Sequence, residues 1–124
     1  MESTQYVPST QSLEHKELGF NEPCTAYYQP TNGYPGWDLI IDGVHTNSIL
    51  EVGFTAPLFK ESFAWFRLTY GWNIHIFTLP ETGWDYYIWQ SIDEQITDDG
   101  ITYFTFEEAE LACLNKLIQM VKNV

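Results

Sequence analysis

The chain is poor in positive charge. Its 124 residues include 5 lysines and arginines against 17 aspartates and glutamates, which gives a formal net charge of -12 at pH 7. A surface of this sign repels phosphate backbones and anionic lipid headgroups. The imbalance therefore argues against direct binding of nucleic acid or of a membrane. It favours a basic protein partner, a divalent cation or solubility alone.

Cysteine and long apolar runs are also scarce. Only Cys24 and Cys113 occur, and no CxxC spacing is present. The sequence shows neither a secretory signal pattern nor an apolar run close to the ~20 residues that span a bilayer. We therefore expect a reduced, intracellular compartment and a fold that does not depend on disulfides.

The signatures of catalysis and of cofactor binding are missing as well. The three histidines, His15, His45 and His75, are dispersed along the chain, and no nucleophile motif surrounds any of them. There is no glycine-rich phosphate loop and no dinucleotide fingerprint. The sequence therefore predicts that no cofactor is bound, and it favours a protein that is not an enzyme.

Aromatic residues, in contrast, are abundant. They make up 17% of the chain, and hydrophobic residues as a whole make up 44%, which is enough to form a buried core. The length suits a polar N-terminal tail, residues 1–10, followed by a single α+β domain, residues 11–124. A core of this size does not hide so many rings, so we expect some of them at an interaction surface.

The residue pattern predicts the element order αββαββ(β)α, with a small antiparallel sheet of about four to five strands packed against two main helices. In chain order the predicted elements are a short helix from Ser9 or Thr10 to Leu18, strands over 24–29 and 37–42, a loop with at most one short strand over 43–55, a helix between Pro57 and Gly71, a hairpin of 72–79 and 84–92, a short strand over 101–104, and a closing helix over 105–124.

The closing helix carries the strongest local signals. Thr105 and Glu108 have the spacing of a capping box, and Phe104 could pack onto Ala109 as a hydrophobic staple. Cys113 is expected to be a small core residue beside the apolar stripe of this helix. The stripe consists of Leu111, Leu114, Leu117, Ile118 and Val121.

Both faces of the predicted hairpin carry apolar side chains. Either helices cover both sides, or one side meets a partner. The candidate binding residues are Trp72, Trp84, Tyr87 and Trp89. We expect Trp72 and Trp84 to be cross-strand neighbours, and ordinary sheet packing is the alternative to a binding role for them.

An acidic cluster follows the hairpin and consists of Asp93, Glu94, Asp98 and Asp99. Calcium and magnesium prefer several oxygen ligands, so these residues are candidate ligands of a weak cation site. Their spacing matches no known calcium loop, and a solvated acidic loop is the alternative.

Three longer stretches carry a resemblance. They are Lys16–Cys24, Ala56–Arg67 and Phe106–Ile118, which read KELGFNEPC, APLFKESFAWFR and FEEAELACLNKLI. In order and spacing they resemble a group of small, uncharacterised proteins encoded by phages and by integrated mobile elements of gut bacteria. The resemblance implies a phage or mobile-element origin, and hence the cytoplasm of a bacterial host cell. It implies no activity, cofactor or site residue.

These observations favour a non-enzymatic protein-binding or regulatory protein that uses an acidic, aromatic-rich surface to contact another protein or a second copy of itself. A variant of this hypothesis is an inhibitor whose carboxylates imitate the phosphates of DNA. The alternative from a different class is a small carboxylate- or divalent-cation-dependent hydrolase that uses residues 93–99.

Overall fold

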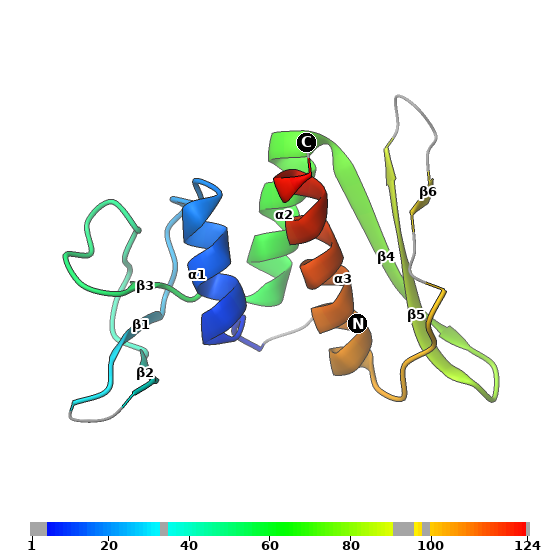
Figure 1. Cartoon of the computed structure of the whole chain (residues 1–124), viewed down its shortest axis with the longest axis horizontal. Coiled ribbons are helices and arrows are strands. Elements are labelled where there is room, and N and C mark those ends of the chain that lie inside the picture. The colour runs from blue at the N-terminus through cyan, green and yellow to red at the C-terminus, as the bar shows by residue number, and fades with distance from the viewer. Residues whose placement is uncertain (1–4, 33–34, 91–95, 98–99, 124) are drawn as a thin grey trace. The chain divides into compact units, whose positions relative to one another are not determined.

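The structure is a computed structural model that describes residues 5–32, 35–90, 96–97 and 100–123. Helices and antiparallel strands follow one another in the order α1 β1 β2 β3 α2 β4 β5 β6 α3 (Figure 1). The predicted α+β class is therefore confirmed. The chain forms two compact units, Met1–Ser62 and Phe63–Val124, called here the N-terminal and the C-terminal unit.

The N-terminal unit contains one helix and a three-stranded sheet. Helix α1 covers Ser9–Glu17, and strands β1 (Tyr27–Pro30), β2 (Trp37–Ile40) and β3 (Phe54–Thr55) pair in the order β2-β1-β3. Helix α1 contacts β3. A small core of the unit consists of Ala26, Tyr28, Phe54 and Ala56.

Helix α1 ends as the sequence predicts. The N–H of Gly19 donates to the Lys16 carbonyl at 3.0 Å, and the N–H of Phe20 donates to the His15 carbonyl at 3.1 Å. These two bonds form a Schellman motif, whose left-handed position Gly19 takes at φ +100°. The motif turns the chain so that Phe20 is buried against the ring of His15.

The segment before α1 is packed against the unit. Tyr6 forms an isolated bridge with Leu58, and the fully buried Val7 donates its N–H to the Pro57 carbonyl at 2.8 Å. The Val7 carbonyl accepts hydrogen bonds from the hydroxyls of Ser12 and Tyr28. The predicted polar tail, residues 1–10, thus includes Tyr6, which forms a β-bridge, and Val7, which is a core residue.

The C-terminal unit contains the second half of α2, three strands and the closing helix. Helix α2 covers Phe59–Tyr70 and crosses the boundary between the units, as the aromatic spacing after Pro57 predicts. Strands β4 (Trp72–Leu79), β5 (Gly83–Gln90) and β6 (Ile96–Thr97) pair in the order β4-β5-β6. Helix α3, Phe106–Lys122, packs against both β4 and β5.

The cap of α3 confirms one sequence prediction and corrects another. Thr105 is the N-cap residue, and its Oγ1 accepts a hydrogen bond from the Glu108 N–H at 3.1 Å. The Glu108 carboxylate accepts the Thr105 hydroxyl proton at 3.1 Å. The predicted staple is wrong, because Phe104 is 89% exposed. The backbone bridge between Tyr103 and Trp84 fixes the chain just before Phe104, whose ring stays in solvent.

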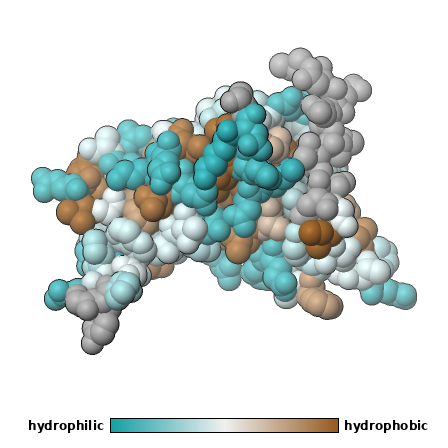
Figure 2. All heavy atoms as spheres, viewed as in Figure 1, coloured by the Kyte–Doolittle hydropathy of each residue, from teal (hydrophilic) through white to brown (hydrophobic). Residues whose placement is uncertain are grey.

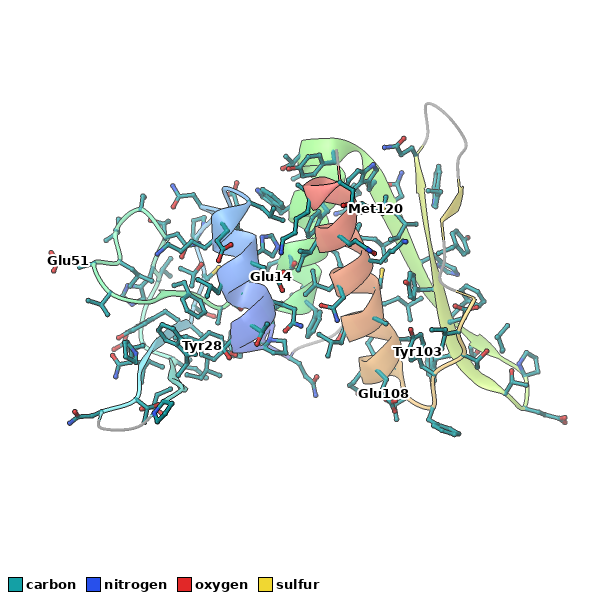
Figure 3. The ribbon with its side chains drawn as sticks, in the orientation of Figure 1. Glu14, Tyr28, Glu51, Tyr103, Glu108 and Met120 are labelled. Atoms are coloured by element: carbon teal, nitrogen blue, oxygen red, sulfur yellow. The ribbon has the colours of Figure 1, made fainter. Side chains whose placement is uncertain are left out.

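Helix α3 is amphipathic, as its sequence predicts. Cys113, Leu114 and Leu117 are fully buried against the sheet. The opposite side of the helix, which faces the viewer in Figure 2, is hydrophilic. Figure 3 places Glu108 at the start of α3 and Met120 near its end. In the described part of the chain, none of the helices combines the length and hydropathy that a membrane crossing requires.

The strands are divided between two sheets of three, whereas the sequence predicts a single sheet of about four to five. The difference arises because the described strands of the two hairpins belong to different sheets, and a local residue pattern specifies each hairpin but not the pairing between hairpins. Each short strand pairs with the neighbouring hairpin and completes a separate small sheet.

Candidate functional site

The register of the β4–β5 hairpin divides its side chains into two faces. Leu79 pairs with Gly83 across the turn, and the pairing continues without a bulge to Trp72 and Gln90. Side chains alternate along a strand, and directly opposite residues share a face. One set, the inner face, contains Trp72, Ile74, Ile76, Thr78, Trp84, Tyr86, Ile88 and Gln90, and the other contains Asn73, His75, Phe77, Leu79, Gly83, Asp85, Tyr87 and Trp89.

The inner face forms the core of the C-terminal unit. Tyr86 and Ile88 are 1% exposed, and Trp72 is 5% exposed. The Trp84 ring meets the ring of Phe106, at the start of α3, in a T-shaped contact with 5.3 Å between centroids. The Trp72 ring stacks on Tyr70 at 4.8 Å. Packing against helices therefore accounts for the aromatic residues on this face.

The other face carries an aromatic cluster that stays accessible. The rings of His75, Phe77 and Tyr87 contact one another at centroid distances of 5.5, 5.2 and 5.6 Å. His75 is exposed, whereas Phe77, Tyr87 and Trp89 are half-buried. Within the C-terminal unit, α3 packs against the inner face of the hairpin and leaves this second face uncovered by that helix (Figure 1). We call these four residues, His75, Phe77, Tyr87 and Trp89, the open face.

The structure separates the four predicted binding residues. Tyr87 and Trp89 belong to the open face, whereas Trp72 and Trp84 belong to the inner face. Trp72 lies opposite Gln90, and Trp84 lies opposite Thr78. The prediction that the two tryptophans are cross-strand neighbours is therefore wrong, because the short turn that pairs Leu79 with Gly83 sets a register that keeps them at opposite ends. Trp72 is buried, and the half-buried Trp84 contacts Phe106, so both fit the alternative of packing within the unit.

Two residues of the open face, His75 and Phe77, were not among the predicted binding residues. Their alternation with Ile74 and Ile76 already assigned them to one face of the strand. The residue pattern does not indicate which face of the hairpin α3 covers. A polar histidine among the apolar residues was the available signal for the solvent side.

The predicted cation ligands, Asp93, Glu94, Asp98 and Asp99, lie outside the described residues. The cation site and the hydrolase that would use it therefore stay predictions. Among the described residues, no three histidine, cysteine, aspartate or glutamate side chains come close enough together to hold a metal ion.

A serine–histidine pair that the sequence does not signal lies in the N-terminal unit. The Nε2 atom of His15 and the Oγ atom of Ser62 are 2.6 Å apart. Burial lowers the pKa of His15 to about 4, so its ring is neutral at physiological pH. Ser62 is fully buried and His15 is 1% exposed, so a substrate has no access to the hydroxyl. The geometry is that of a buried structural hydrogen bond.

Cys24 is equally remote from nucleophilic chemistry. It is 1% exposed, and burial raises the pKa of its thiol to about 11, so the reactive thiolate is disfavoured at neutral pH. Cys24 and His45 pair through two backbone hydrogen bonds of 2.8 and 2.9 Å. The His45 ring is bonded to Asp42, which raises the pKa of that histidine.

No protein-family model matches the chain, and no curated protein or solved structure matches it either.

Proposed function

We propose that this chain is a non-enzymatic protein-binding or regulatory protein of phage or mobile-element origin that acts in the cytoplasm of a bacterial host and binds a partner protein through the open face. The observation that carries the proposal is the contrast between the two sides of one hairpin. Tyr86 and Ile88, on the face that packs against α3, are 1% exposed, whereas on the opposite face Phe77, Tyr87 and Trp89 are half-buried and His75 is exposed.

Accessible aromatic rings of this kind suit an interface. Tyrosine and tryptophan are enriched among interface residues whose truncation weakens binding by ~2 kcal/mol or more, because each ring buries a large area and has few rotamers to fix. In the open face, the contacts of Tyr87 with His75 and Phe77 already restrict those rings. A partner would therefore meet a preorganised surface and lose little side-chain entropy on binding.

The charge of the hairpin indicates the chemistry of the partner. Residues 72–90 contain Glu81 and Asp85 but neither lysine nor arginine. Asp85 lies opposite Phe77, on the same side as the open face. A complementary surface would place apolar or aromatic side chains against the rings and a lysine or arginine beside Asp85. The proposed partner is accordingly a protein with a basic, partly apolar patch.

A photo-crosslinking experiment tests this proposal. The photoreactive residue p-benzoylphenylalanine is placed at Tyr87 in one protein and at Leu68 in another. Leu68 is a matched control, because it is 84% exposed, lies in the same unit and belongs to α2. After irradiation in bacterial cells, we expect a distinct crosslinked protein at position 87 that is absent at position 68, and mass spectrometry identifies it.

The captured protein is then purified and titrated with the unmodified chain and with Tyr87→Ala. Loss of a hot-spot ring should weaken binding ~30-fold, which corresponds to ~2 kcal/mol. Equal affinity for both proteins would show that the open face is not the binding surface. Crosslinks between two copies of this chain would show that the open face mediates self-association and would overturn the proposal of a foreign partner. A very steep fall of affinity with salt would point to the phosphate-mimicking variant.

A further inference from the structure

The N-terminal unit exposes a strip of apolar side chains that the open face does not include. The larger hydrophobic residues that stay well exposed are concentrated between residues 37 and 52. They are Trp37 at 41%, Leu39 at 40%, Ile41 at 63%, Val44 at 66%, Ile49 at 71% and Val52 at 62%. Figure 2 shows apolar side chains on the loop between β2 and β3, and Figure 3 places Glu51 at the outer end of that loop.

This strip begins on an edge strand. In the sheet order β2-β1-β3, strand β1 lies in the centre, and no further strand among the described residues pairs with β2. Edge strands present backbone donors and acceptors to which another strand can bind. An edge that also exposes apolar side chains is a template for such pairing.

The hydrogen-bond pattern indicates which backbone groups of β2 point outward. The Thr31 N–H donates to the Gly36 carbonyl at 3.1 Å and closes the β1–β2 hairpin. Hydrogen-bonded pairs alternate along an antiparallel ladder, so Asp38 and Ile40 bond to β1. The N–H and C=O groups of Trp37 and Leu39 therefore point away from β1, toward the edge.

The side chains of β2 divide into one side with Trp37 and Leu39 and another with the exposed Asp38 and the half-buried Ile40. Trp37 and Leu39 share the side of Tyr28, and the Trp37 ring meets Phe54 in a T-shaped contact at 4.7 Å. Asp38 points to the other side, opposite Gln29. A strand beside β2 would need apolar side chains next to Trp37 and Leu39 and a basic side chain next to Asp38 on the other side, which the alternation of a single extended peptide can provide.

Two occupants could pair with the edge of β2: a second copy of this chain or an extended peptide of another protein. The charges around β2 favour the peptide. Residues 37–53 contain Asp38, Asp42 and Glu51 and neither lysine nor arginine. In the antiparallel register that pairs Trp37 with Leu39 of a second copy, the two Asp38 carboxylates would lie directly opposite each other, and such like-charge pairs destabilise a sheet. A basic peptide would instead place lysine or arginine beside Asp38.

We propose that β2 is a strand-acceptor edge that takes an extended segment of a partner protein, in which apolar residues alternate with lysine or arginine. The inference rests on β2 alone and is independent of the open face. In this mode, main-chain hydrogen bonds to Trp37 and Leu39 provide affinity, and the two sides of the strand provide specificity.

A random display library of peptides of about ten residues, the length of a long strand, is the probe. It is selected against the whole chain and, in parallel, against Leu39→Pro. Proline at this position removes the outward N–H and leaves the bonds to β1 in place, and edge strands tolerate it. A third selection uses Asp38→Lys, which reverses the charge and keeps every backbone group.

The unchanged chain should enrich peptides that alternate apolar and basic residues, and Leu39→Pro should bind them at least ~10-fold more weakly. Asp38→Lys should enrich peptides with acidic residues in place of the basic ones. Amide hydrogen exchange at Trp37 and Leu39 should slow at least ~10-fold when the enriched peptide is bound. Failure to enrich any peptide, enrichment that ignores both substitutions, or protection that rises with protein concentration alone would overturn the proposal.

Discussion

The Nε2 atom of His15 lies 2.6 Å from the Oγ atom of Ser62, although 47 positions separate the two residues in the sequence. The hydrogen bond joins α1 to the first half of α2, and both side chains are buried. Because burial penalises the imidazolium form, the pKa of His15 falls from its ordinary 6.5 to about 4. The lowered pKa makes this ring one source of a pH-dependent stability.

The first prediction concerns that dependence. Between pH 6.5 and 4 the unfolded chain binds a proton at His15 that the folded chain does not, so the free energy of unfolding should fall as the pH falls through this window. The loss from this group should approach ~3 kcal/mol near pH 4 and should be absent above pH 6.5. Urea unfolding between pH 7.5 and 4.5 measures it. His15→Asn is the comparison, and parallel pH profiles for the two proteins would contradict the prediction.

The second prediction concerns the partner of His15. Ser62→Ala removes the hydroxyl that meets Nε2 in a fully buried position, so the free energy of unfolding should drop by ~1–3 kcal/mol. Ser9, which is half-buried at the start of α1, provides a control, because Ser9→Ala changes the same atoms near the surface. Chemical denaturation of both variants gives the comparison, and equal effects would argue against a special contribution of the buried bond.

Much of the C-terminal unit could be predicted from the sequence, because its signals are local. Thr105 and Glu108 fix the start of α3, and the alternation of Trp72–Leu79 gives β4 with the bounds that the structure has. The pairing of His15 with Ser62 could not be predicted, because no local pattern specifies a contact across 47 positions. The exposure of Leu39 was equally hidden, since an alternating apolar strand looks the same whether or not a neighbour covers it.

The third prediction uses two glycines that differ in their surroundings. A Cβ atom on Gly83 would collide with the backbone carbonyl of Tyr103, whereas a Cβ atom on Gly71 would meet nothing within 4 Å. Both residues have positive φ, +129° and +75°, so alanine is strained at each. Gly71→Ala should lower the free energy of unfolding by about 1 kcal/mol. Gly83→Ala should cost a further ~1–3 kcal/mol from the collision.

Thermal unfolding of the two glycine variants, in parallel with the unchanged protein, gives the difference. The bridge between Trp84 and Tyr103, with backbone hydrogen bonds of 2.7 Å in both directions, is the contact that the Gly83 substitution should disturb. If the two alanine variants melt at the same temperature, the close approach of Gly83 to Tyr103 does not contribute to the free energy of unfolding.

The fourth prediction addresses the cap of α3. Thr105→Ala removes the Oγ1 atom that accepts the Glu108 N–H, and this should lower the free energy of unfolding by about 1 kcal/mol. Thr105→Ser keeps the hydroxyl and should restore most of the stability. Denaturant titration of the two variants separates the hydrogen bond from the loss of the methyl group. A serine variant as unstable as the alanine variant would exclude the cap as the cause.

The final prediction distinguishes two tryptophans that the sequence grouped together. Trp72 is 5% exposed and stacks on Tyr70, so Trp72→Ala should lower the free energy of unfolding by ~3–5 kcal/mol. Trp89 is half-buried on the open face, so Trp89→Ala should cost about 1 kcal/mol. Urea titrations of both variants test this difference. If Trp89 instead proved as costly to remove as Trp72, the ring would belong to the core, and the open face would lose one of the residues on which the proposed interface depends.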